Sequence, residues 1–461
     1  MKKTFSVLLC AAIVITMTVS TFAGYDANYE VRVNGKTVAF EKAEPQLLGD
    51  QAFLPLVTVF KQLGLDNISW NGTARTVTAQ GGGVKVVLTI GDKAVSITKD
   101  GTTKTVIADE APYIDNGSTY ISADLIADAL DYIVEWDVNG LNVLKINTAP
   151  DYFVSKEGGM SYLSYDMDPV LTVPSGSVVR FETDDAWRGL LTGRETPYAA
   201  VKDQYPHTTA DYNPVSGPVY IEEAKAGDII RIEIQKIELA DEGHMYQGAD
   251  FLKLYHLAPE DICQSFYIKD GKAYMDDTGL VLELAPMVGC ISVAPTVERS
   301  PAYSLDPDTF GGNMDCTRIK EGTVLYLKAN VDGALINTGD LHACMGDGEA
   351  SGMGIEIPGF VTLKLDVIKG VELPIQYPMA VEGGELIIMG HAPTMDEAIM
   401  NAINDTHAFL TQVAGFSKND AANLISIASN VRVNQIVDTL MGARVEFSLE
   451  LLEQNGYKFD L

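Results

Sequence analysis

The stretch Asp228-Ile-Ile-Arg-Ile-Glu-Ile234 decides the fold class of the larger part of this chain. Its apolar residues alternate with charged ones or run together after a turn, which is the pattern of a β-strand packed on a core. Four similar stretches lie between Gly, Pro and Asp turns: Val178-Val-Arg-Phe-Glu-Thr183, Gly217-Pro-Val-Tyr-Ile221, Thr323-Val-Leu-Tyr-Leu327 and Gly359–Val367. This spacing predicts a β-sandwich or barrel within residues 151–461.

Helix signals gather near the C-terminus. Thr394-x-x-Glu397 is a capping box, in which two side chains satisfy backbone amides at the start of a helix. Gly415 is placed to end that helix, and Ser417 begins a second one that runs to about Ser429. One face of the first helix is formed by Ile399, Ala402, Ile403, Thr406, Leu410 and Val413. The predicted class is therefore mainly β with α+β parts and C-terminal helices.

Residues 27–148 form a separate unit with an internal repeat. Val31-Arg-Val-Asn-Gly35-Lys-Thr-Val38 indicates a hairpin whose two-residue turn is Asn34-Gly35. Phe53-Leu-Pro-Leu56 then leads into a short helix and a strand that ends at Trp70. The same order recurs about 66 residues later, over residues 120–136. This pattern predicts a small duplicated α+β domain, joined by a Pro-containing linker at 147–151 to a second domain over 151–461.

The first unit resembles the copper amine oxidase N-terminal-like domain, also called a stalk domain. The resemblance is carried by Val33-Asn-Gly35, Phe53-Leu-Pro-Leu56, Leu63-Gly64, Trp70, Tyr120 and Trp136. The unit contains no histidine, whereas a copper site needs imidazole or soft sulfur ligands. The resemblance implies a spacer or attachment module that associates with the cell wall. Tyr113 and Tyr120 either bind glycan or pack in the core.

The first 23 residues predict a secretory signal peptide. Two lysines precede an apolar run from Phe5 to about Val19, and Thr21-Phe22-Ala23 places small residues for cleavage after Ala23. The alternative is an uncleaved membrane anchor, but the run is shorter than the ~20 residues needed to span a bilayer. We therefore expect a secreted, extracellular protein. Its remaining cysteines either form disulfides or act as small apolar residues: Cys263, Cys290, Cys316 and Cys344.

The charge of the chain is strongly negative and unevenly distributed. There are 63 acidic and 33 basic residues, a formal charge of −30. Residues 151–461 hold 47 of the acids and 21 of the bases. Nucleic acid is excluded as a partner, because its binding requires clustered cations. The acids also supply oxygen ligands for hard cations.

The densest polar segment is Asn337-Thr-Gly-Asp-Leu-His-Ala-Cys-Met-Gly-Asp-Gly-Glu349. Asp340 and His342 are two residues apart, so both point to one face if the segment is extended. Asp347 and Glu349 repeat that spacing. One imidazole and up to three carboxylates can bind a divalent cation and leave one carboxylate as general base. The alternative is a glycine-rich acidic turn capped by its own side chains.

This part of the chain resembles the acetamidase/formamidase family over residues of about 151–455. The matching motifs are Phe181-Glu-Thr-x-Asp185-Ala, Asn213-Pro-Val-Ser-Gly-Pro-Val-Tyr220, Ala226-Gly-Asp228, Pro286-Met-Val-Gly289, Val293-Ala-Pro295, Gly311-Gly-Asn-Met-Asp315, the Gly339–Glu349 string, Asp396-Glu-Ala398 and Val431-Arg-Val-Asn-Gln435 with Val437-Asp438. The family implies hydrolysis of short aliphatic amides to ammonia and a carboxylic acid, with a divalent metal, zinc or calcium, and a homodimeric state.

The resemblance also implies roles for individual residues. Asp185, Asp340 and His342 are the expected metal ligands. Glu349 or Asp347 is the expected base that deprotonates the attacking water. Asn313 is expected to donate a hydrogen bond to the substrate carbonyl, and Asp315 to orient a ligand.

One residue departs from the family pattern. A histidine usually precedes the Gly-Gly-Asn-Met-Asp string, and Phe310 stands there instead. Loss of that imidazole would remove a ligand, change the metal or abolish turnover. The alternative function is therefore a degenerate amidase fold that acts as an extracellular or cell-wall binding protein. A third hypothesis, based on the acidity, is a structural calcium-binding surface protein.

Overall fold

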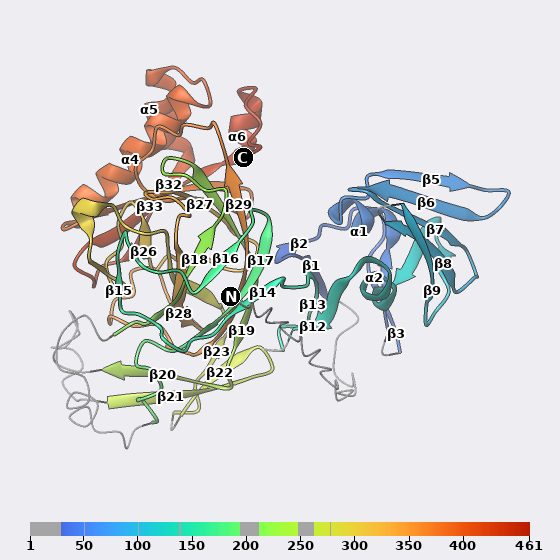
Figure 1. The fold of residues 1–461 in the computed structure, drawn as a ribbon, viewed down its shortest axis with the longest axis horizontal. Helices are drawn as coiled ribbons and strands as arrows, with labels where there is room; N and C mark the ends of the chain where they lie inside the picture. Colours follow the sequence, from blue (N-terminus) through green and yellow to red (C-terminus); the bar gives the residue numbers. More distant parts are fainter. Residues whose placement is uncertain are drawn as a thin grey trace, which may run out of the picture.

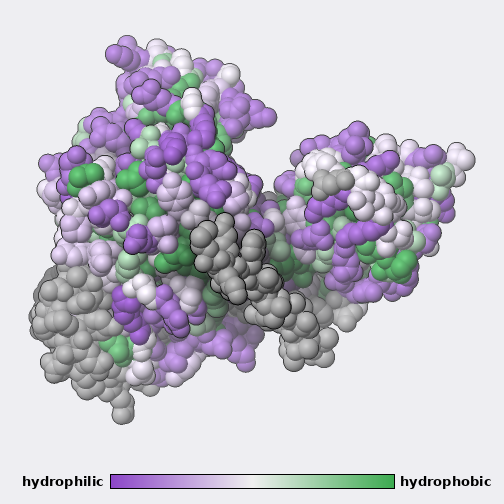
Figure 2. Space-filling model, viewed as in Figure 1, coloured by the Kyte–Doolittle hydropathy of each residue, from purple (hydrophilic) through white to green (hydrophobic). Residues whose placement is uncertain are grey.

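The computed structural model describes residues 29–49, 51–99, 101–137, 140–193, 212–247, 262–276 and 278–461. The predicted signal peptide lies outside these residues. The chain forms a smaller N-terminal body and a larger C-terminal body (Figure 1). Hydrophilic side chains cover much of the visible face of both (Figure 2), as the excess of acidic residues requires. None of the helices described has the length and apolar character needed to cross a membrane.

The internal repeat predicted for the N-terminal domain is confirmed. In the first copy β4 (Gln51–Pro55) leads into α1 (Leu56–Gln62) and then β5 (Asn67–Asn71). In the second copy β11 (Ser118–Ser122) leads into α2 (Ala123–Leu130) and then β12 (Tyr132–Trp136). β4 and β11 pair antiparallel, with Pro55 opposite Tyr120, so the two copies share one sheet.

The predicted hairpin at Asn34-Gly35 is also confirmed. Both turn residues have positive φ, 47° and 78°, as a tight hairpin turn requires. The hairpin belongs to the sheet ordered β12-β13-β1-β2, beside the sheets β10-β11-β4-β3 and β5-β6-β7-β8-β9. The remaining strands of the domain are β1 (Glu30–Val33), β2 (Lys36–Thr37), β3 (Gln46–Leu48), β6 (Thr76–Gly81), β7 (Val84–Thr89), β8 (Ala94–Lys99), β9 (Thr102–Ile107), β10 (Tyr113–Asp115) and β13 (Val143–Thr148).

The C-terminal domain is built around a nine-stranded sheet, whose strand order is β14-β17-β29-β19-β27-β30-β31-β33-β32. The stretch at 228–234 becomes β19 (Ile229–Leu239), which pairs antiparallel with both β27 and β29. The predicted strands at 178–183, 323–327 and 359–367 are all in this sheet. Its other members are β14 (Tyr152–Val154), β17 (Ser177–Thr183), β27 (Val324–Lys328), β29 (Gly359–Ile368), β30 (Met379–Glu382), β31 (Glu385–Ala392), β32 (Ser429–Gln435) and β33 (Met441–Ser448).

A second, five-stranded sheet packs against the first, and one of its strands contains the first half of the polar segment Asn337–Glu349. Its order is β16-β18-β28-β24-β26, with β16 (Leu171–Val173), β18 (Val215–Ile221), β28 (Ile336–His342), β24 (Met287–Ser292) and β26 (Gly311–Asn313). One core joins apolar side chains from both sheets, including Ile232 of β19, Val219 of β18 and Leu341 of β28. The predicted sandwich-type architecture is confirmed, and β28 lies at its centre.

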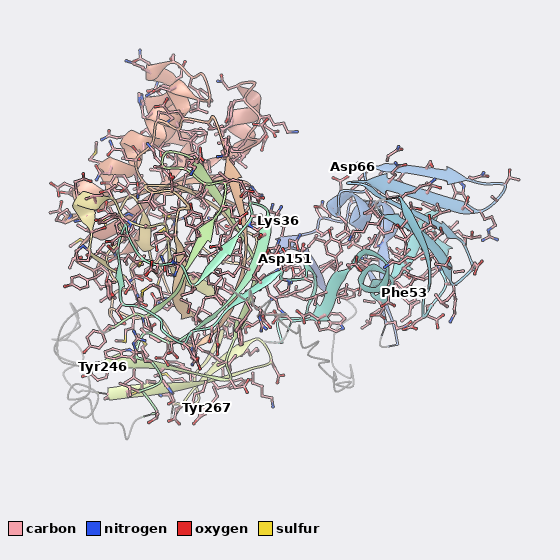
Figure 3. The ribbon with its side chains drawn as sticks, viewed as in Figure 1. Lys36, Phe53, Asp66, Asp151, Tyr246 and Tyr267 are labelled. Atoms are coloured by element: carbon pink, nitrogen blue, oxygen red, sulfur yellow. The ribbon has the colours of Figure 1, made fainter. Side chains whose placement is uncertain are left out.

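The rest of the C-terminal domain consists of a small sheet and the predicted helices. β20 (Glu242–Gln247), β21 (Ile262–Lys269), β22 (Lys272–Met275) and β23 (Val281–Glu283) form a meander, which contains the labelled Tyr246 and Tyr267 (Figure 3). β15 (Tyr162–Leu163) pairs with β25 (Ala302–Tyr303), and a 3-10 turn covers Val297–Arg299. α4 (Met395–Gln412) and α5 (Lys418–Ala428) begin after Thr394 and Ser417, whose side chains cap them as predicted. α6 (Leu449–Gln454) follows β33.

The two domains meet through a buried group of charges. Lys145 Nζ of β13 lies 2.5 Å from Asp137 Oδ2 and 2.5 Å from Glu321 Oε1 of the C-terminal domain. Glu321 also accepts hydrogen bonds from Arg32 Nη1 at 3.1 Å and the Ile237 amide at 2.6 Å. The labelled Lys36 lies where the bodies meet (Figure 3). The N-terminal domain is therefore fixed to its neighbour by charge pairing.

All four cysteines within the described residues are free thiols. Cys263, Cys290 and Cys316 are buried, and Cys344 is half-buried. Of the two expectations for them, the structure supports packing as small apolar residues.

Candidate functional site

The strand β28 brings Asp340 and His342 together, as their spacing predicted. His342 Nε2 lies 3.4 Å from Asp340 Oδ1 and 3.1 Å from Glu356 Oε1. The backbone is not fully extended, because Asp340 has a φ of +61°. Both side chains are almost completely buried.

Besides Asp340 of the same strand, carboxylates from other segments of the chain surround His342. One ligand atom from each of Asp315, His342 and Glu349 lies within 4.8 Å of the other two, and the same holds for Asp340, His342 and Glu356. The five residues in these two overlapping groups are all buried. We call them the histidine–carboxylate group.

Several polar atoms of this group lack a hydrogen-bond partner among the described residues. They are Asp315 Oδ1, His342 Nδ1, Glu349 Oε2 and Glu356 Oε2. An unpartnered buried polar atom is costly unless something else binds it. Imidazole nitrogen and carboxylate oxygen are the ligands that zinc accepts, so the residues present fit a divalent cation.

Two asparagines organise the carboxylates. Asn313 Nδ2 donates to Asp315 Oδ2 at 2.6 Å and to Asp438 Oδ2 at 3.1 Å. Asn213 Nδ2 in turn donates to Asn313 Oδ1 at 3.0 Å. Because the two hydrogens of the Asn313 amide are directed at carboxylates, this arrangement makes Asn313 a bridge between them.

The electrostatics of the group are dominated by crowded negative charge in a buried place. Burial and neighbouring carboxylates hold the pKa values of Asp315, Glu349 and Asp438 well above the ordinary range. Burial raises the pKa of Glu356 to about 7. Burial acts to lower the pKa of His342, but Glu356 and Asp340 raise it well above its usual value. A divalent cation would relieve this repulsion by taking the place of the bound protons.

Backbone strain also concentrates here. Asn213, Asp315, Asp340 and Glu349 all have positive φ, between 38° and 61°. Non-glycine residues rarely adopt this region, and such outliers are typical of functional sites. Gly289 of β24 packs against the group so closely that an added Cβ would lie 2.4 Å from Asp340 Oδ2 and 2.6 Å from Asp315 Oδ1.

Two cavities border the histidine–carboxylate group. The first, about 570 Å³, is lined by Asp340, Glu356, Asn313 and Asp438 together with aromatic and aliphatic side chains. The second, about 610 Å³, lies beside Glu349 and Asp347. Met353 lines both of them. The group therefore lies between two hollows.

Three predicted site residues lie outside the histidine–carboxylate group, and of these Asn313 touches it through Asp315. Asp347 pairs with Arg444 Nη2 at 2.8 Å and accepts from Thr317 Oγ1 at 2.7 Å. Asp185 Oδ1 accepts from the backbone amides of Trp187 at 2.8 Å and Gly189 at 3.0 Å, which fixes a turn. Their roles as base and ligand stay predictions. Phe310, which replaces the expected histidine, packs in the core between the sheets.

Sequence reasoning did not select Glu356, Asp438 or Asn213 as site residues. Glu356 is a single carboxylate between Ile355 and Ile357, and it reaches His342 through an isolated β-bridge. Asn213 and Asp438 lie within motifs that match the family, which was the one available signal.

The fold and this centre define a mostly β protein with a buried histidine–carboxylate site. A solved acetamidase from Bacillus halodurans is 33% identical, with a TM-score of 0.62, and the match covers 66% of this chain and 100% of that one. A predicted acetamidase/formamidase from Thermoanaerobacter tengcongensis, also solved, is 32% identical with a TM-score of 0.61, covering 67% and 99%. The chain belongs to the acetamidase/formamidase family.

The matches found by sequence cover a smaller part of the chain than the structural matches do. Residues 283–445 match the acetamidase/formamidase family, and residues 32–144 match the copper amine oxidase N-terminal domain. The acetamidase of Mycolicibacterium smegmatis is 39% identical over 75 residues, which is 16% of this chain and 18% of that relative. The chain thus spans about a fifth of this curated relative in sequence alignment, whereas the two structural matches span 99–100% of the solved chains and about two thirds of this one.

Proposed function

We propose that this protein is a secreted, metal-dependent hydrolase of linear amides of the formamide and acetamide type, which releases ammonia and a carboxylate. The observation that carries the proposal is the set of unpartnered, buried ligand atoms around His342 beside a cavity. Family membership supports the same reaction.

Residues around His342 would hold the cation. His342 belongs to both ligand groups, with Asp315 and Glu349 on one side and Asp340 and Glu356 on the other. Zinc accepts imidazole and carboxylate together, whereas calcium prefers oxygen alone, so we propose zinc rather than calcium. Such a cation, when bound, polarises a carbonyl and makes a water molecule more acidic.

The protein side chains would then move the proton and orient the reactants. Glu349 is buried and its Oε2 has no hydrogen-bond partner among the described residues, so its ionised carboxylate would be placed to take a proton from water and return it to the departing nitrogen. Asn313 holds Asp315 and Asp438 in place. The water oxygen bonds to the carbonyl carbon, the C–N bond then breaks, and one water proton moves to the leaving nitrogen, so that the products are ammonia and a carboxylic acid, which ionise to ammonium and carboxylate.

Chelation is the direct test of metal dependence. The purified full chain should release ammonia from formamide or acetamide. It should lose at least about 100-fold of that rate after EDTA, and regain it with zinc. Elemental analysis of the untreated protein should identify the metal. Absence of turnover on any linear amide in metal-loaded protein would favour the alternative, a binding protein, which retention on purified cell walls would reveal.

Gly289→Ala should lower metal affinity by roughly 10- to 100-fold, the usual effect of disturbing groups that hold ligands. The new methyl would collide with carboxylate oxygens of Asp340 and Asp315 and force them apart. Titration calorimetry with zinc would measure the change. Gly346→Ala is the matched control, because a Cβ there meets no atom within 4 Å. Equal affinities in the two variants would contradict this placement of the ligands.

We also propose secretion, association with the cell wall through the N-terminal domain, and a homodimer. The first 23 residues support secretion through their signal-peptide pattern. Detection of a chain beginning after Ala23 in the culture medium would test it. Sedimentation of the purified protein would test the dimer.

A further inference from the structure

The first cavity is far larger than the smallest amides need. Its volume is about 570 Å³. A water molecule takes up about 30 Å³ of liquid, so an amide of four non-hydrogen atoms would fill roughly a fifth of this space. Cavities of this size in proteins commonly hold molecules with many more atoms.

At two places in the lining of this cavity, a polar residue and an apolar residue are consecutive in the sequence. Asn213 is preceded by Tyr212, and Asp438 by Val437, and all four line the space. The apolar part of the lining also includes Ala186, Trp187, Tyr303, Leu305, Met353 and Leu440, and further polar side chains come from Arg299, Asp306 and Thr439. At these two places a polar group and an apolar side chain therefore line the cavity side by side, whereas Arg299 and Asp306 add charge elsewhere in the lining.

The aromatic part of the wall is built in advance of any ligand. The Trp187 ring meets Tyr212 edge-on at 4.9 Å and Tyr246 at 5.9 Å between centroids. Trp187 and Tyr246 are almost fully buried. The carboxylate of Asp185 holds the backbone of this turn through the amides of Trp187 and Gly189. A rigid aromatic wall loses little entropy when it receives an apolar group.

We propose that the preferred substrate is a primary amide whose acyl group carries an aromatic or branched apolar substituent, with the carboxamide at the histidine–carboxylate group and the substituent against Trp187, Tyr212 and Leu440. The inference rests on the proposed amide hydrolysis and specifies its substrate class. Water adds to the carbonyl carbon, one of its protons moves to the nitrogen, the C–N bond breaks, and ammonia and the substituted carboxylic acid leave.

A matched pair of substrates tests this inference. Acetamide and 2-phenylacetamide differ by one phenyl group, so the ratio of their kcat/KM values reports what the wall contributes. We expect the zinc-loaded full chain to favour 2-phenylacetamide at least tenfold. Preference for acetamide would overturn the inference and leave the proposed function standing. Hydrolysis of neither would reject the proposed function, and the inference with it.

A variant that fills the cavity provides the second test. Leu440 is partly exposed and lines the space. Leu440→Trp should shift the kcat/KM ratio at least tenfold toward acetamide, because the added ring occupies the volume meant for the substituent. Ile427→Ala, on the exposed face of α5 and outside the cavity lining, should keep the wild-type ratio. An unchanged ratio in a folded Leu440→Trp protein would overturn the proposal.

Discussion

Glu349→Gln is expected to lower kcat for amide hydrolysis by at least about 100-fold, within the range that a positioned general base contributes. Glutamine keeps the shape of the side chain but cannot accept the proton of the attacking water. Glu349 is buried, and its Oε2 has no hydrogen-bond partner among the described residues, so this atom is available for water or metal. Ammonia release under saturating amide would measure the effect.

Asp347→Asn separates the two candidate bases. Asp347 faces Arg444 and Thr317, and about a third of its side chain is exposed. If Asp347 is the base, its variant loses turnover and Glu349→Gln does not, which would reverse our assignment. Glu453→Gln on the exposed side of α6 controls for removal of a negative charge. Because Glu349 is also a candidate ligand, zinc content must be measured in each variant.

Local patterns in the sequence were sufficient for the strands and for the first pair of site residues. The alternation at 228–234 predicts β19 because a strand of a sheet that packs on a core must bury its apolar residues. The spacing of Asp340 and His342 predicts their contact because both belong to the same strand. Such features depend on neighbours in the chain, which a sequence displays directly.

Contacts between residues far apart in the sequence could not be predicted from local sequence patterns. Glu356 meets His342 through an isolated bridge, and Asp438 meets Asn313 across 125 residues of chain. Nothing in the local pattern separates Glu356 from an ordinary residue of an alternating strand. Asp185 is a residue that the sequence did select, as a metal ligand. A carboxylate cluster at a strand end is, however, equally typical of a metal ligand and of a turn whose backbone amides the carboxylate caps. The structure shows that its oxygens bind backbone amides.

The contacts between the two domains could not be predicted from the sequence either. The linker at 147–151 is consistent with a loosely tethered module, and charge counts do not reveal which residues pair. The structure places Lys145 and Glu321, 176 residues apart, in one buried contact. An added Cβ at Gly35 would lie 2.4 Å from the Gly322 amide nitrogen, so the backbones of the two domains touch. The N-terminal domain is therefore positioned by specific contacts in addition to the linker.

Lys145→Met should lower the free energy of unfolding by about 3–5 kcal/mol, the usual cost of removing one partner of a buried ion pair. The Lys145 side chain is 2% exposed, and its ammonium lies between the carboxylates of Asp137 and Glu321. Without that ammonium Asp137 and Glu321 lose the cation that they share, although Arg32 Nη1 still lies 3.1 Å from Glu321 Oε2. Denaturant unfolding of the full chain would measure the loss, and small-angle scattering would show whether the domains separate.

Lys99→Met is the matched control, because its pair with Asp131 is more than half exposed and should contribute about 0–1 kcal/mol. Equal losses in the two variants would show that the junction charges do not fix the N-terminal domain, which would then act as a loosely tethered module.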